Sequence, residues 1–251
     1  MNESELDRYS RQLLLPNFDI DGQCKLMASH ILVVGMGGLG NIAATYLATS
    51  GVGTLTLADG DQLALSNLPR QVLYEDTQIG MHKVAAAAEQ LAKKNPQVKI
   101  HTILEFLEDE ALQRAVDVAD VVLDCTDNFT ARKSIHRACL ASKTPLVSAA
   151  AIRWEGQLVN FLYHQQSSPC YECLYPDLAD QQLSCNESGV IAPVVGMLGI
   201  FQALEALKLA SGCGEVKHGY LRLFDGFTGQ WREMRLTQDP ECSACSRKTG
   251  I

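Results

Sequence analysis

The sequence has no excess of positive charge. Its 251 residues include 21 Lys and Arg against 29 Asp and Glu, which gives a formal net charge of −8. A chain of this sign repels the phosphates of nucleic acids and the headgroups of anionic membranes. We therefore expect neither nucleic acid nor a membrane as a main partner.

Targeting and membrane-spanning segments are also missing. The first residues, MNESELDRYSRQ, are polar and charged, unlike a secretory signal. The longest apolar region, Val190 to Ala210, is interrupted by Pro193, Gly196, Gly199, Glu205 and Lys208. This region predicts a buried loop and helix rather than a membrane span. We expect a soluble, cytoplasmic protein without internal repeats.

Nine cysteines without a secretory signal indicate metal binding or reactive thiols rather than a disulfide scaffold. Cys170-x-x-Cys173 and Cys242-x-x-Cys245 form two knuckles that together supply the four thiolates of a closed, structural zinc site. Two redox-active pairs are the alternative, although neither lies at a predicted strand-to-helix junction.

The remaining cysteines differ in their surroundings. Cys185 lies in a polar stretch, 183–189, that could be mobile and exposed. Its thiol is therefore a candidate nucleophile, with a structural role as the alternative. Four others are predicted to be small buried residues: Cys24, Cys125, Cys139 and Cys213.

A glycine turn between two apolar runs is the strongest local signal. The run Ile31–Val34 predicts a strand, and four glycines follow it: Gly35, Gly37, Gly38 and Gly40. Segment 42–50 has helical spacing, and a second apolar run, 54–57, leads to Asp59. Strand, glycine turn, helix, strand and acid in this order are typical of a βαβ unit that binds an adenine nucleotide.

Each part of this unit has a physical role. Gly35 permits the tight turn, Gly37 lets a phosphate approach the backbone, and Gly40 lets helix and strand pack closely. Asp59 lies near the spacing of about 20 residues at which an acid binds ribose hydroxyls. The alternative is a glycine turn that only packs the helix on the sheet. The motif alone does not distinguish a redox cofactor from a nucleotide substrate.

Polar residues follow the later strands. The segment SNLPRQ (66–71) brings Asn67 and Arg70 after the second strand, where loops of parallel sheets bind ligands and these side chains suit phosphate. Lys83 opens a predicted helix, 83–94. A lysine in the first turn opposes the helix dipole, which an anionic ligand would explain. The alternative is a solvent-facing lysine.

A pair of carboxylates ends the fourth predicted strand, 121–124. The sequence there is Asp124-Cys125-Thr126-Asp127-Asn128. Carboxylates beside a nucleotide suggest Mg²⁺, which prefers oxygen ligands. We expect Asp127 to bind Mg²⁺ and Asp124, nearer the strand, to order the loop.

The second half of the chain changes its pattern. Strands at 98–103 and 145–148 and helices at 108–116 and 131–142 continue the parallel half. Apolar residues then alternate in the antiparallel manner over 157–163, 219–224 and 230–235. We expect an α/β fold with a Rossmann-like mixed sheet, parallel in its first half and antiparallel in its C-terminal half, after a helical N-terminal arm.

Taken together, these motifs resemble the MoeB/ThiF family of ubiquitin-activating-enzyme-like adenylyltransferases. The resemblance covers nearly the whole chain and is carried by RYSRQ (8–12), GMGGLG (35–40), Asp59, SNLPRQ (66–71), Lys83, DCTDN (124–128), the two knuckles and Cys185. It implies an enzyme that uses ATP to adenylate the C-terminal glycine of a small ubiquitin-like sulfur carrier and releases pyrophosphate. The activated carrier would then pass to a sulfur donor.

The resemblance also implies roles for single residues. The nucleotide would contact Gly35, Gly37, Gly38, Gly40, Asp59, Asp61, Ser66, Asn67, Arg70, Lys83, Asp127 and Asn128. The catalytic residues would be Arg11, Arg70, Lys83, Asp127 and Cys185. Arg11 would reach the ATP of the other subunit of a homodimer. Cys185 matches a cysteine that is catalytic, or linked to the carrier, in some relatives.

The resemblance further implies a single domain over 1–251, with a helical arm (1–28), a nucleotide-binding half (29–150) and a half for the carrier and zinc (151–251). No sulfurtransferase segment follows residue 245, so we expect a separate sulfur donor. Two residues depart from the family pattern. Pro69 removes an N–H that could reach phosphate, and His82 is expected to loosen the turn before Lys83.

The choice of carrier is a finer question. Segments 151–157 and 189–193 look more like the molybdopterin-synthase activator, whereas 173–177 and 223–226 look more like the thiamine-carrier activator. We expect the molybdopterin carrier, with the thiamine carrier as the alternative. An NAD-dependent oxidoreductase and a non-catalytic scaffold are more distant alternatives, which the charged residues after Asp59 disfavour.

Overall fold

The computed structural model describes residues 1–163, 168–176 and 189–246. Its eight described strands form one sheet in the order β3-β2-β1-β4-β5-β6-β7-β8. The strands are β1 His30–Val34, β2 Thr54–Ala58, β3 Lys99–Ile103, β4 Val121–Asp124, β5 Leu146–Ile152, β6 Glu155–Phe161, β7 Tyr220–Asp225 and β8 Gln230–Arg235. Pairing is parallel from β3 to β5 and antiparallel from β5 to β8, so the predicted mixed sheet is confirmed.

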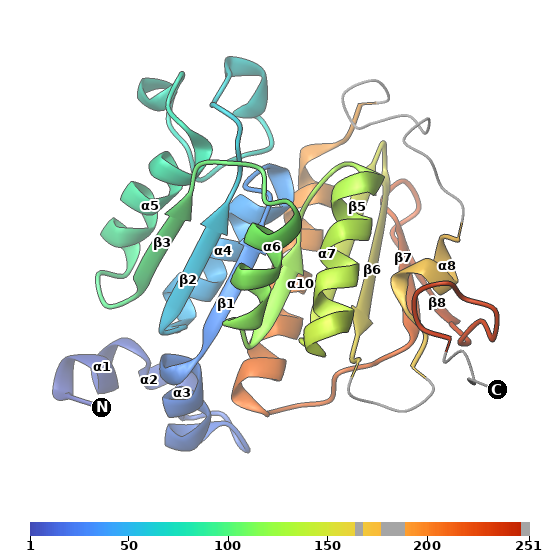
Figure 1. Cartoon of the computed structure of the whole chain (residues 1–251). Helices are drawn as coiled ribbons and strands as arrows, with labels where there is room; N and C mark the ends of the chain where they lie inside the picture. The colour runs from blue at the N-terminus through green and yellow to red at the C-terminus, as the bar shows by residue number, and fades with distance from the viewer. Residues whose placement is uncertain (164–167, 177–188, 247–251) are drawn as a thin grey trace.

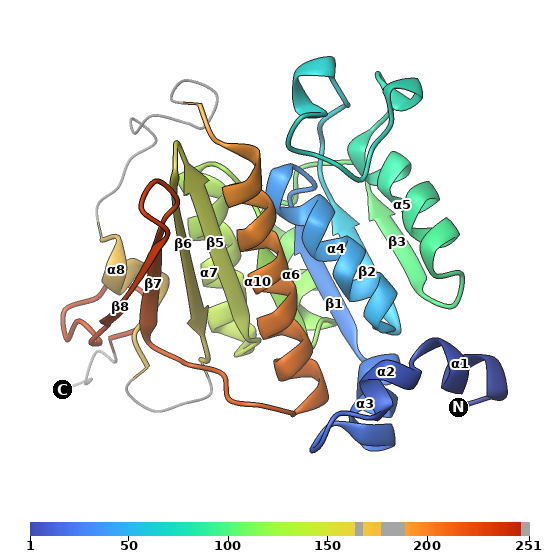
Figure 2. The same cartoon turned by 180° about the vertical axis from the view of Figure 1, so that it is seen from behind.

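Helices cover both faces of this sheet. The described helices are α1 Glu3–Arg8, α2 Ser10–Leu13, α3 Asp19–Ala28, α4 Gly38–Ser50, α5 Lys83–Lys94, α6 Asp109–Asp117, α7 Phe129–Ser142, α8 Tyr171–Leu174 and α10 Ala192–Ser211. α6 and α7 lie on the face seen in Figure 1. α4, α5 and α10 lie on the opposite face, seen in Figure 2. The buried core fills the space between sheet and helices.

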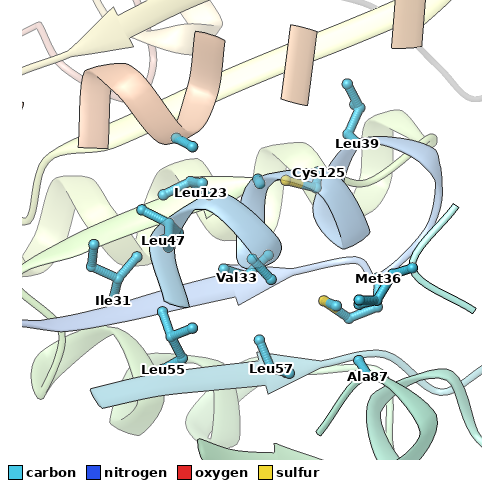
Figure 3. Packing of buried hydrophobic residues seen from close by; sticks show 14 of the residues in the cluster. Ile31, Val33, Met36, Leu39, Leu47, Leu55, Leu57, Ala87, Leu123 and Cys125 are labelled. Carbon is cyan, nitrogen blue, oxygen red and sulfur yellow. The ribbon is translucent and has the colours of Figure 1, made fainter. Parts of the chain in front are cut away.

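The central core is built by β1, β2 and α4. Val33 of β1, Leu57 of β2 and Leu47 of α4 are fully buried and point into one cluster (Figure 3). Burial of each such side chain contributes about 1.5–3 kcal/mol relative to exposure. This packing holds α4, and with it the glycine turn, against the sheet.

Most element boundaries follow the sequence patterns. The bounds of α5, β4 and β8 are those predicted. α4 begins at Gly38, four residues earlier than expected, because the glycines themselves enter its first turn. β5 continues to Ile152, beyond the predicted end at 148, since its alanines pair with β6.

The N-terminal arm is helical but broken. Tyr9 ends α1 instead of continuing it, because its buried side chain accepts a hydrogen bond from Asn95 Nδ2 at 2.9 Å. Leu14, which shares its helical spacing, is exposed. The arm therefore forms three short helices at the amino ends of the strands (Figure 1).

α10 is the described helix that is long and apolar enough to cross a membrane by length and composition. It packs along α4 and β5 instead. Pro193 lies in its first turn, and Gly196 and Gly199 lie inside it, so the predicted loop is absent from 192–211. A Cβ on Gly199 would lie 2.5 Å from the Leu39 carbonyl oxygen, which shows how closely α10 approaches α4.

Replacing Gly40 should reveal how tightly the glycine turn packs. A Cβ there would lie 1.9 Å from the Gly35 carbonyl oxygen. We expect Gly40→Ala to lower the free energy of unfolding by about 1–3 kcal/mol, measured by urea denaturation. Gly196→Ala is the matched control, because a Cβ there meets nothing within 4 Å. Equal stability of the two variants would contradict this packing role.

Candidate active site

A cavity of about 720 Å³ opens at the carboxyl ends of the parallel strands. The loops after β1, β2, β3 and β4 line it together, because parallel strands end at the same edge of the sheet. Ten of the predicted nucleotide contacts line the cavity: Gly35, Gly37, Gly38, Asp59, Asp61, Asn67, Arg70, Lys83, Asp127 and Asn128.

Three predicted site residues of the described chain do not line the cavity. Gly40 is buried beneath the turn. Ser66 is exposed, and its carbonyl oxygen accepts a hydrogen bond from Arg70 Nη1 at 2.9 Å. Arg11 is exposed on α2, at the opposite end of the sheet (Figure 1). Cys185 lies outside the described residues.

The glycine turn is held by close backbone approach and by two side chains. Gly35 has a φ of +91°, and a Cβ there would lie 2.8 Å from the Cys125 carbonyl oxygen. Asp59 Oδ2 accepts a hydrogen bond from the Met36 N–H at 2.7 Å, and the Tyr74 hydroxyl donates to the Met36 carbonyl at 2.8 Å. The turn is thus fixed between β2 and β4.

Lys83 does not face solvent. It is 6% exposed, and its Nζ lies 2.6 Å from Asp61 Oδ2 and 4.0 Å from Asp59 Oδ2. Burial raises the pKa of Asp59, and the Lys83 charge works against that rise. The site therefore places one buried cation beside two carboxylates.

Backbone contacts hold the turn before Lys83. Gln62 and His82 form an antiparallel β-bridge, and the Lys83 N–H donates to the Asp61 carbonyl at 3.0 Å. The turn is thus hydrogen-bonded, and the expected loosening relative to a proline at this position stays a prediction. His82 becomes the N-terminal cap of α5 in an extended conformation.

The two carboxylates at the end of β4 have different surroundings, and the loop-ordering role predicted for Asp124 is confirmed. Asp124 is buried, and its oxygens accept hydrogen bonds from the Thr126 N–H at 3.1 Å, the Thr126 hydroxyl at 2.7 Å and the Ser148 hydroxyl at 2.7 Å. It orders the loop. Asp127 is exposed and lines the cavity, so its carboxylate can reach a ligand there.

Among the lining residues that were not predicted from the sequence to contact the nucleotide, three stand out. Phe106, after β3, is 66% exposed and lies against Gly60. Gln71 is buried next to Arg70, at the end of a motif that could have revealed it. Arg132 is buried in α7 and donates from Nη2 to the Thr126 carbonyl.

A second cavity, of about 490 Å³, adjoins the first. Asp127, Asn128, Arg132 and Ala151 line both cavities. The remaining walls of the second cavity come from β5 to β8, from Phe129 of α7 and from Tyr175. The two cavities together extend from the end of β3 across the sheet edge to the antiparallel strands.

The four knuckle cysteines come together although they lie far apart in the sequence. Their Sγ atoms are all within 4.8 Å of one another, at separations that include 3.4 Å for Cys173–Cys245 and 3.6 Å for Cys170–Cys242. The Asp239 N–H points to Cys173 Sγ at 3.4 Å. The cluster could therefore hold a metal ion.

The other described cysteines only partly follow the expectation of burial. Cys125 and Cys139 are buried, as predicted. Cys24 is exposed and Cys213 is partly exposed, so the expectation is wrong for both. Cys24 lies on α3, a short helix with one face in solvent.

Removing the Lys83 charge should make stability depend on pH. In Lys83→Met, the buried Asp59 loses its counter-charge. We therefore expect the free energy of unfolding to fall by about 1–3 kcal/mol near pH 7. A carboxyl with a raised pKa in the folded state destabilises that state when ionised, so the loss should shrink as pH falls to about 5. Urea denaturation at both pH values measures it. Lys93→Met, exposed on the same helix, is the control, and a pH-independent loss would refute the pairing.

Comparison with known proteins shows what the chain resembles. Its residues 9–244 match the ThiF family. A molybdopterin-synthase adenylyltransferase of Escherichia coli (strain K12) is 44% identical over 247 residues, which cover 98% of this chain and 99% of that protein. A sulfur carrier protein ThiS adenylyltransferase of the same strain is 46% identical over 245 residues, covering 98% and 97%.

A solved structure shares the fold at lower identity. Crystalline E. coli MccB with MccA-N7isoASN superposes with a TM-score of 0.84 at 23% identity, over 98% of this chain and 76% of that chain. The family match spans most of the sequence, and the two E. coli relatives align along almost all of it. The chain therefore belongs to the ThiF family.

Proposed function

We propose that this protein adenylates the C-terminal carboxylate of a small ubiquitin-like sulfur carrier, with ATP as the second substrate and pyrophosphate as a product. One observation carries the proposal: Arg70, Lys83 and Asp127 line a single cavity beside the glycine turn, and that cavity adjoins a second one. The names of the E. coli relatives, both adenylyltransferases, support it.

The order of the strands supports one orientation of the nucleotide. Phe106 follows β3, Asp59 follows β2, the glycine turn follows β1 and Asp127 follows β4, which is the order of these strands in the sheet. A base against Phe106, a ribose at Asp59 and phosphates over the turn would fill the cavity in that sequence. The phosphates would then lie between Asp59 and the second cavity.

The chemistry follows from this placement. A carrier carboxylate that enters through the second cavity would attack the α-phosphate, and pyrophosphate would leave. Such a transfer needs positioning and charge neutralisation more than covalent help from the protein. Arg70 and Lys83 supply positive charge, and the main-chain N–H groups at the start of α4 face the phosphates.

A magnesium ion suits the exposed carboxylate of Asp127, since hard cations take oxygen ligands. Asp124 is already engaged by Thr126 and Ser148, which leaves Asp127 as the carboxylate of this loop for the ion. When bound with ATP, Mg²⁺ would neutralise charge on the phosphates.

We further propose a homodimer in which Arg11 acts across the interface. Arg11 does not line the cavity of its own chain. The outward faces of α4 and α10, which pack side by side, expose Tyr46, Ile200 and Leu204. Apolar side chains exposed on adjacent helices favour burial against a second copy of the chain.

Zinc is the metal that the four-cysteine cluster fits best. Four thiolates at about 2.3 Å from a tetrahedral Zn²⁺ ion are about 3.8 Å apart, close to the separations between these sulfur atoms. A site with four protein ligands has no open position, so the ion would join the knuckle on α8 to the C-terminal segment.

The reaction is tested by ATP–pyrophosphate exchange with each purified carrier. We expect exchange only when a carrier is present, and more with the molybdopterin-type carrier than with the thiamine-type carrier. Sequence identities of 44% and 46% to the two kinds of relative do not separate them. Tight NAD binding without carrier-dependent exchange would refute adenylation, and a preference for the thiamine-type carrier would reverse the pathway assignment.

Asp127→Ala provides the matching variant. It should abolish exchange while leaving carrier binding measurable by calorimetry, because the side chain acts on the nucleotide. Retained turnover would refute the role in Mg²⁺ binding.

Metal analysis tests the zinc site. We expect about one Zn²⁺ per chain, and we expect Cys242→Ser to lose it together with much of the stability, because metal binding and folding are coupled. Cys24→Ser should retain the metal, since Cys24 is exposed on α3 and outside the cluster. Folded, freshly purified protein without zinc would contradict the assignment.

A further inference from the structure

A buried carboxylate links both cysteine knuckles to α7. Glu172 lies between Cys170 and Cys173, and its side chain is 2% exposed. It accepts hydrogen bonds from Arg137 Nε at 2.7 Å and from Arg137 Nη2 at 3.1 Å. Ser243, between the other two cysteines, donates to it at 3.4 Å. One side chain therefore contacts α7 and both knuckles.

The segment around α8 contacts α7 at two places, near the middle of the helix and at its first residue. Lys133 Nζ lies 3.6 Å from Glu172 Oε2, near the middle of the helix. At its first residue, Phe129 packs edge-on against Tyr175, with ring centroids 5.9 Å apart. The Tyr175 hydroxyl in turn donates to Gln157 Oε1 of β6 at 2.8 Å. These contacts limit both sliding and tilting of α7.

The amino end of α7 is part of the nucleotide cavity. Asn128 caps the helix by accepting a hydrogen bond from the Ala131 N–H at 2.8 Å, and Asp127 precedes it. Arg132, in the second turn, lines both cavities. Because a helix moves as a rigid element, a displacement of its middle also displaces Asp127. A shift of about 1 Å at such a site can reduce activity about a hundredfold.

The glycine turn is held independently of these contacts. Asp59 and Tyr74 bind the turn through Met36, and both residues lie outside α7 and α8. Movement of α7 would therefore change the Asp127 side of the cavity while leaving the phosphate-facing turn in place.

We propose that Glu172 is a positioning residue that couples the four-cysteine site to the Asp127 side of the nucleotide cavity. The inference rests on the proposed adenylation and on the proposed metal. With the knuckles joined by the metal, Glu172 holds α7 in register. When the metal is lost or the carboxylate is neutralised, the position of Asp127 is no longer fixed and Mg²⁺-dependent binding of ATP weakens.

The test compares ATP affinity with and without Mg²⁺ in Glu172→Gln, by calorimetry on the full-length protein. We expect about a tenfold loss of affinity for MgATP but less than about a twofold change for ATP alone, because only the side that carries Asp127 moves. Zinc content should stay at one per chain. A loss of affinity for MgATP that is larger than the loss for ATP alone distinguishes a positioning role of Glu172 from a general loss of structure.

Glu205→Gln is the matched control. Glu205 of α10 is a carboxylate of similar burial, 1% exposed, paired with Lys208 of the same helix at 2.9 Å and with Arg222 of β7 at 3.2 Å. It should lower stability but leave both affinities within about twofold of the wild type. If Glu172→Gln does not fold, Arg137→Met removes the same ion pair from its more exposed side and should show the same split.

Three results would overturn the proposal. They are unchanged MgATP affinity in a folded, zinc-loaded variant, equal losses with and without Mg²⁺, and the same split in Glu205→Gln. Failure of the wild-type protein to bind ATP or to adenylate any carrier would instead refute the proposed function, so the two failures are distinguishable.

Discussion

Parallel pairing of four neighbouring strands is the constraint on which the rest of the structure depends. β3, β2, β1 and β4 run in one direction, so the loops after them must meet at one edge. The fit there is tight, since Gly35 leaves no room for a Cβ beside the Cys125 carbonyl. Side chains from Asp59 to Asp127 line one cavity for this reason, although many residues separate them.

Buried carboxylates then join elements that the strand ladder does not. Asp59 connects β2 to the glycine turn, Glu172 connects α8 to α7, and Glu205 connects α10 to β7 through Arg222. A buried ion pair adds little net stability compared with apolar packing, but removing one partner is costly. Such pairs therefore specify how the elements sit relative to one another.

Much of this arrangement could be predicted from the sequence because local patterns determine it. Apolar runs marked the strands, the glycines marked the turn, and the loop-ordering role of Asp124 followed from its closeness to the strand. Phe106 and Arg132 could not be found in this way, because their proximity to the cavity depends on how loops and helices pack. The break of the arm at Tyr9 likewise depends on Asn95, a distant partner.

The pairing of Lys83 with Asp61 has a consequence for exchange at the site. The ammonium group lies 2.6 Å from a carboxylate that is itself half in solvent. In the proposed reaction, a phosphate arriving at Lys83 would replace one anion with another, and the displaced carboxylate could be hydrated at once. Because the lysine keeps a negative partner throughout, nucleotide entry and product departure need not leave a bare buried cation. In the proposed reaction, the same two side chains would allow both binding and release of phosphate.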